Sequence, residues 1–147
     1  MSERRTLDFD RTDAIMSDVD RLLEGHTTSG KWTLGMICDH LAKAVRATTL
    51  GRGAGAPSTP EQDEARAAFF RDRSIPEGRP VPAAFLEPDF HAEAPKAAET
   101  LRDALARLDA FEGPWPTHRL IGTMTRDEWH QFHCVHCAHH LSFAHPA

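Results

Sequence analysis

The sequence has no tyrosine, only three cysteines and no long apolar run among its 147 residues. Without tyrosine, no phenol can act as a general acid in a catalytic site. Three cysteines are an odd number, and residues 1–13 lack the apolar segment of a secretory signal, so we expect reduced thiols in a cytoplasmic protein. Because the apolar runs are only a few residues long, no membrane-spanning segment is expected.

A surplus of basic residues is also absent, since 17 Lys and Arg stand against 22 Asp and Glu. The formal net charge is −5 and no basic stripe stands out, so nucleic acid is not an expected partner. The length fits one domain, residues 1–147, which is large enough to bury a core without a disulfide or a structural metal ion.

Helical periodicity dominates the pattern that is present, and no strand-like alternation of useful length is found. Four main helices are predicted: residues 9–24, 34–50, 95–111 and a last segment from residue 125 that ends before residue 146. Thr33 is the expected N-cap of the second helix. Thr125 and Glu128 form a capping box at the start of the last helix.

The second and third helices are separated by a proline-rich segment, because residues 57–95 hold seven of the ten prolines. A short helix is predicted between Glu61 and Arg73, followed by an extended segment over residues 75–90. A crossover of this length lets the third helix enter from either end of a bundle. The predicted fold is therefore an all-α, four-helix bundle with one long crossover.

Histidine is concentrated in residues 129–143, "WHQFHCVHCAHHLSF", which hold five of the ten histidines. At ~100° per residue, four of them share one arc of the helix with its large apolar residues: His133, His136, His139 and His140 with Trp129, Phe132 and Phe143. His130 and His145 fall on the opposite side and are expected to be solvated. This interleaving with apolar residues argues against an accidental surface run.

Buried imidazoles need partners, and a metal ion can satisfy several of them at once. His136 and His140 are four residues apart, so their side chains meet one helical turn apart, as in helical zinc sites. His40, in "CDHLA" of the second helix, is the candidate third ligand. The competing interpretation is a purely structural helical domain whose histidines hydrogen-bond one another.

The cysteines of the last helix form a C-x-x-C pattern with two sharper interpretations. Haem attachment needs a histidine directly after Cys137, where Ala138 stands. A thioredoxin-like motif needs a helix N-terminus, whereas Cys134 lies more than two turns inside the predicted helix. Cys134 also points about 160° away from His136, so it is not expected to join the same ion. Packing is the expected role of these thiols.

Three stretches, "GKWTLGMICDHLAKAV", "IPEGRPVPAAFLEP" and "IGTMTRDEWHQFHCVHCAHHLSF", resemble the DUF1569 group of the DinB/YfiT-like superfamily. The resemblance extends from about Leu7 to Phe143. It implies an up-down-down-up four-helix bundle that holds a divalent metal ion (zinc, nickel or iron) with His40, His136 and His140. The additional His133 and His139 leave open whether a pairing such as 133/136 replaces the pair 136/140.

Some members of that superfamily are thiol S-transferases or hydrolases, so the resemblance implies a metal-dependent enzyme that activates a water or a small thiol. The alternative is a non-catalytic metal- or ligand-binding bundle. Asp39, Glu128 and His133 are the candidate acid/base or supporting groups. Expected partners are a small-molecule substrate, such as a low-molecular-weight thiol, and a second copy of the chain in a homodimer. Candidates for the walls of an apolar pocket are Trp32, Trp115, Trp129 and the pair Phe69–Phe70, and core packing explains each of them about as well.

Overall fold

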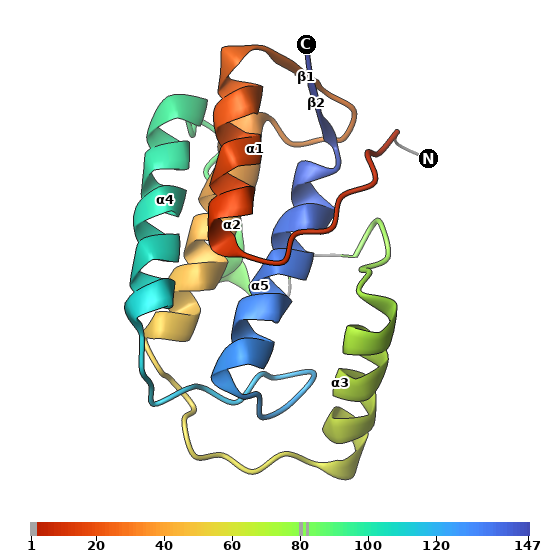
Figure 1. The fold of residues 1–147 in the computed structure, drawn as a ribbon, viewed down its shortest axis with the longest axis vertical. Helices are drawn as coiled ribbons and strands as arrows, with labels where there is room; N and C mark the ends of the chain where they lie inside the picture. The colour runs from red at the N-terminus through yellow and green to blue at the C-terminus, as the bar shows by residue number, and fades with distance from the viewer. Residues whose placement is uncertain (1–2, 80, 82) are drawn as a thin grey trace.

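The computed structural model describes residues 3–79, 81 and 83–147, and it is mostly helical (Figure 1). Its elements in chain order are α1 (Thr12–Glu24), β1 (His26–Thr28), α2 (Leu34–Thr49), α3 (Pro60–Asp72), the short 3-10 helix η1 (Ala84–Leu86), α4 (Ala94–Ala110), α5 (Arg126–Leu141) and β2 (Ala144–Pro146). The predicted all-α class is confirmed. Within the described part of the chain, no helix is long and apolar enough to span a membrane.

The helix ends follow the predicted signals closely. The Thr33 side chain accepts a hydrogen bond from the backbone N–H of Met36 and caps α2. At α5, Thr125 and Glu128 accept each other's backbone N–H groups in the predicted capping box. The first helix begins at Thr12 rather than Phe9, which is buried ahead of the helix.

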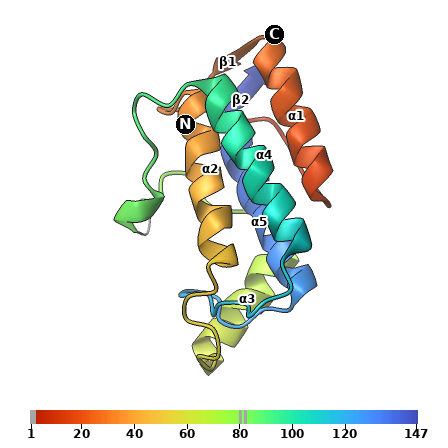
Figure 2. The ribbon, with the colours of Figure 1, turned by 90° about the vertical axis from the view of Figure 1, so that its left-hand side faces the viewer.

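The main core lies where α1, α2, α4 and α5 pack together, with the most extensive packing between α2 and α4. Figures 1 and 2 show these four helices grouped together, with α3 set apart beside the lower half of α5. Each of the four contributes fully buried leucines or equivalent apolar residues: Leu22, Leu41, Leu101 and Leu141 have no exposed surface. Burial of one such side chain stabilises the fold by roughly 1.5–3 kcal/mol.

The crossover between α2 and α4 contains the predicted helix, observed as α3. This helix buries no residue fully, but Phe69 and Phe70 pack against a second apolar cluster formed by Ile121, Met124 and Trp129. The segment predicted to be extended over residues 75–90 includes η1, and at residues 80 and 82 that prediction lies outside the described residues.

The crossover returns close to α2 before α4 begins. A Cβ atom on Gly35 would collide with the backbone of Ala92, so glycine lets the chain pass directly over the first turn of α2. Three hydrogen bonds continue this contact along α2: Asp39 accepts from the Asp89 N–H, Lys43 donates to the Glu87 carbonyl, and His40 bonds the Leu86 carbonyl. The crossover is thereby fixed against the helix that carries His40.

The structure adds one short strand pair to the helices, where the sequence has no strand-like alternation of useful length. The three-residue strands β1 and β2 pair antiparallel, with His26 opposite Pro146, where the segments that follow α1 and α5 meet (Figure 1). Strands of three residues are too short to produce a recognisable alternation, and only the meeting of the two helix ends creates the pair.

Candidate metal centre

Three histidines from two helices converge on one point. His40 lies in the middle of α2, and His136 and His140 lie one turn apart on α5. The Nε2 atom of His136 is 3.2 Å from Nε2 of His40 and 3.1 Å from Nε2 of His140. The three ligand atoms lie within 4.8 Å of one another, so this group could hold a metal ion. The structure therefore brings together the three residues selected from the sequence.

The protonation of His40 is set by the crossover. Its Nδ1 lies 2.6 Å from the carbonyl oxygen of Leu86, and a carbonyl can only accept a hydrogen bond. Nδ1 of His40 therefore carries the proton, which leaves a lone pair on Nε2, the atom that faces His136. A carbonyl on the second ring nitrogen is the usual support of a metal-binding histidine.

Burial keeps all three imidazoles neutral. Desolvation is the main cause that lowers the pKa of His40, and it holds the pKa values of His136 and His140 well below the usual 6.5. The neighbouring histidines lower the pKa of His136 and His140 further, because two adjacent imidazolium ions repel each other. At neutral pH the group thus offers nitrogen lone pairs rather than positive charges.

The geometry and the donor set suit a small divalent cation. In a tetrahedral site with metal–nitrogen distances of 2.0–2.1 Å, two nitrogen ligands are about 3.3–3.4 Å apart, close to the separations measured here. Nδ1 of His136 is buried and has no hydrogen-bond partner among the described residues. Three neutral nitrogen ligands would leave an ion its full +2 charge and at least one open coordination position.

A cavity of about 330 Å³ adjoins this group on the side of His140. Its lining is Gly30, Lys31, Trp32, Ile37, Glu77, Gly78, Arg79, His139, His140 and Phe143. The indole of Trp32 stacks on His140 with ring centroids 5.2 Å apart and also contacts His40. Of the aromatic residues expected to wall a pocket, Trp32 lines this cavity, whereas Trp115, Trp129, Phe69 and Phe70 belong to the second apolar cluster.

The two additional histidines of the arc point to other partners. His133 is fully buried, its Nε2 lies 2.9 Å from the Thr48 hydroxyl, and burial lowers its pKa to about 3. Nδ1 of His139 lies 3.0 Å from a guanidinium nitrogen of Arg4; burial, followed by the charge of Arg4, lowers the pKa of His139 to about 4. The structure leaves both outside the group formed by His40, His136 and His140.

The carboxylates selected from the sequence are engaged in structural contacts. Asp39 accepts from the Asp89 N–H and pairs with Lys43 at 2.8 Å, while Glu128 closes the capping box of α5. The group that does touch the site, the backbone carbonyl of Leu86, was missed by the sequence analysis. No side-chain pattern can reveal it, because any residue type supplies the same carbonyl.

The remaining histidines and the cysteines of α5 lie outside the candidate metal centre. His130 and His145, expected to be solvated, are half-buried, and His145 bonds the Ser29 hydroxyl across the strand pair. Burial is the main cause that raises the pKa of Cys134 to about 11 and that of Cys137 well above 9. Both thiols are free and packed in the main core, as expected for a packing role.

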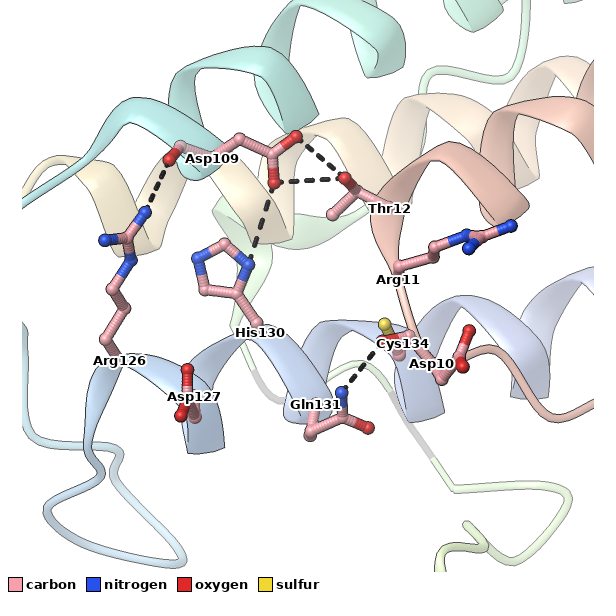
Figure 3. A pocket seen from close by; sticks show the side chains of 9 residues that line it. All are labelled: Asp10, Arg11, Thr12, Asp109, Arg126, Asp127, His130, Gln131 and Cys134. Atoms are coloured by element: carbon pink, nitrogen blue, oxygen red, sulfur yellow. Dashed lines mark hydrogen bonds and ion pairs between the residues drawn. The ribbon is translucent and has the colours of Figure 1, made fainter.

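A second cavity, of about 500 Å³, lies between the N-terminal ends of α1 and α5 (Figure 3). In Figure 3 the Asp109 carboxylate accepts from the Thr12 hydroxyl and lies 3.7 Å from Nδ1 of His130. Nε2 of His130 is buried and has no hydrogen-bond partner among the described residues. Arg126 donates to the Asp109 carbonyl. The contact between Thr12 and Asp109 ties the start of α1 to the end of α4.

Comparison with known proteins places the chain in a family whose function is unknown. A family model described as "Protein of unknown function (DUF1569)" matches residues 1–147, so the chain belongs to this family. No curated protein and no solved structure matches the chain.

Proposed function

We propose that this member of the DUF1569 family binds a divalent ion of zinc, nickel or iron and uses it to activate a water or a small thiol, as a hydrolase or thiol S-transferase. The ligands are Nε2 of His40, His136 and His140. The observation that carries this proposal is the convergence of three neutral imidazoles, one buried (His40) and two half-buried (His136 and His140). The Leu86 carbonyl fixes His40 with its lone pair toward the others.

The ion would supply a positive charge that lowers the pKa of a bound water or thiol toward neutrality. The chain supplies the orientation and the exclusion of water. Trp32 covers one side of His140 and His40, and the Leu86 carbonyl holds the His40 ring in place. The cavity beside His140, about 330 Å³, fits a small-molecule substrate.

We assign the fold to the DinB/YfiT-like type, a four-helix bundle with up-down-down-up order. This assignment is supported by the packing of α2 against α4 and α5, by the packing of α1 against the same two helices, and by the long connection between α2 and α4. A cytoplasmic location is part of the proposal and is supported by the three free, buried thiols.

One observation favours a second candidate, a non-catalytic metal- or ligand-binding bundle. Asp39, Glu128 and His133, the candidate acid/base groups, are held by Asp89, Thr125 and Thr48 respectively. A catalytic site built on this group would therefore depend on the ion and the substrate for proton transfer. A binding protein has no such requirement.

The test begins with metal analysis of protein purified without an affinity tag, with His40→Ala as the control. We expect about one equivalent of zinc, nickel or iron in the wild type and none in the variant, with the same helical circular dichroism spectrum. Loaded protein is then assayed for conjugation of small thiols to electrophiles and for ester hydrolysis. Metal binding with neither activity would favour the binding protein. A wild type without metal would overturn the enzyme and a metal-binding role, and would leave only a bundle that binds a ligand without metal.

A further inference from the structure

The mouth of the cavity beside His140 carries positive charge although the chain as a whole is acidic. The formal net charge of the chain is −5, yet the cavity lining contains Lys31 and Arg79 against the single acidic residue Glu77. Arg4 adds a further positive charge at the rim, where its guanidinium contacts the lining residues His139 and Phe143. An ion held by three neutral imidazoles would add to this field, so the cavity attracts anions.

Arg4 is held in one orientation from three sides. Its Nε donates to the Ser142 hydroxyl at 2.9 Å, its Nη2 lies 3.0 Å from Nδ1 of His139, and its guanidinium carbon lies 4.8 Å from the centre of the Phe143 ring. A guanidinium can only donate, so Nδ1 of His139 is the acceptor in this contact. His139 therefore orients Arg4 with a neutral ring.

Arg4 and the adjacent Arg5 differ in whether a carboxylate neutralises their charge. The Arg5 guanidinium forms two bonds to the Asp18 carboxylate, at 2.8 and 2.9 Å, and also donates to the carbonyls of Leu141 and Ala144. Among the described residues no carboxylate pairs with Arg4, and no partner binds its Nη1. Arg5 anchors the N-terminal segment, and this anchor leaves the Arg4 guanidinium available beside the cavity.

We propose that Arg4 is the specificity residue of this cavity and binds the carboxylate or phosphate group of an anionic substrate whose reacting group reaches the metal centre. This inference rests on the proposed function for the role of the ion. Guanidinium presents parallel N–H donors that match two oxygens of a carboxylate or phosphate group. Lys31 and Arg79 attract the anion, and Arg4, with its fixed orientation, sets its position.

The probes are two thiols that differ mainly in charge, 3-mercaptopropionate and 2-mercaptoethanol. Binding to cobalt-loaded protein is followed through the absorption that a thiolate on cobalt produces. We expect the wild type to bind 3-mercaptopropionate at least about tenfold more tightly than 2-mercaptoethanol, in line with one charge-assisted contact. In Arg4→Gln most of this preference should disappear, leaving only the smaller part due to Lys31 and Arg79, while the absorption spectra of both complexes stay unchanged. Competition by acetate or by inorganic phosphate shows which oxyanion the site prefers.

The matched control is Arg71→Gln, an arginine on α3 that pairs with Asp72, and it should keep the wild-type preference. Equal binding of both thiols by the wild type, or an undiminished preference in Arg4→Gln, would overturn the inference while leaving the metal centre intact. If the protein takes up no cobalt, the proposed function fails. The same two-thiol comparison is then followed by NMR on metal-free protein, where Arg4→Gln must still weaken binding of 3-mercaptopropionate for the anion site to stand.

Discussion

Two sides of α5 pack against other helices, and burial has opposite chemical results on them. On the side toward the main core, Cys134 and Cys137 have no exposed surface and pack with Leu141 and Cys38. On the other side, His136 and His140 meet His40 and Trp32. Residues 136 and 137 are adjacent in sequence, yet one belongs to the candidate metal centre and the other to the core.

Burial favours the neutral form of the thiols and of the imidazoles, but only the neutral imidazole can bind a metal ion. It raises the pKa of Cys38 to about 12, and a protonated thiol is a poor ligand and a poor nucleophile. It lowers the pKa of His136, and a neutral imidazole is the form that binds metal. The same desolvation therefore keeps the thiols protonated and unreactive, and keeps the histidines neutral and able to bind metal.

The sharpest test of this comparison substitutes the two adjacent residues. His136→Ala should remove bound metal completely, because the remaining His40 and His140 form only a two-ligand site. Cys137→Ala should retain the full metal content and lose only packing. Metal analysis of both variants, with circular dichroism as the folding check, measures the difference. Metal retained in His136→Ala would show that other ligands hold the ion.

Acidification should destabilise the protein through its histidines, whereas the cysteines, already protonated, should contribute nothing to this loss. The unfolded chain binds protons on histidine near pH 6.5. In the folded protein, burial lowers the pKa of His133 to about 3 and that of His118, a half-buried residue between α4 and α5, to about 4. The unfolded state therefore gains protons first, and stability falls as the pH drops from about 6.5 toward 4. Each such histidine should lower the free energy of unfolding by about 1.5 kcal/mol between pH 6.5 and pH 5.

Denaturant midpoints of the metal-free protein at pH 7, 6 and 5 measure this loss. His91→Gln, a change at an exposed position, is the control and should leave the slope unchanged. A midpoint that does not move between pH 7 and pH 5 would falsify the assignment of these histidines as buried and neutral. A metal-loaded sample should lose its ion over the same range, since protons compete for the ligands.

A smaller effect on metal binding is expected from loosening the crossover segment that contacts His40. Asp39→Asn loses the ion pair with Lys43 and weakens the bond to the Asp89 N–H, which loosens the segment that presents the Leu86 carbonyl to His40. Metal affinity, measured by competition with a chelator, should fall about tenfold, as for other supporting groups of metal ligands. Asp20→Asn breaks an exposed pair with Arg102 and should leave the affinity unchanged.

The smallest effect on the site should come from removing both thiols of α5. Cys134→Ala/Cys137→Ala should keep its metal and its activity, because both thiols pack in the main core and neither lines the cavity beside His140. Stability should fall by roughly 1–2 kcal/mol through lost packing. Activity measured at equal metal content decides the outcome. Loss of activity with the metal still bound would identify a protein thiol as the nucleophile.

Local rules explain the features of α5 that were predicted correctly. Thr125 and Glu128 fix its start because a capping box needs only four consecutive residues. The spacing of His136 and His140 places both rings on one side of any α-helix, whatever surrounds it. The helices from residue 34 and from residue 126, and the packing role of Cys134 and Cys137, follow from the same periodicity.

The sequence by itself determined the helices, their caps and the pair of imidazoles one turn apart, because these depend on neighbours within a few residues. The sequence also offered His40 as the candidate third ligand, but only the tertiary structure brings it to the pair, since His40 is 96 residues from His136. The fold also placed the Leu86 carbonyl on His40, turned His139 toward Arg4 and buried His133 against Thr48. Those roles depend on long-range contacts and on backbone atoms, and a pattern of residue types along the chain contains neither.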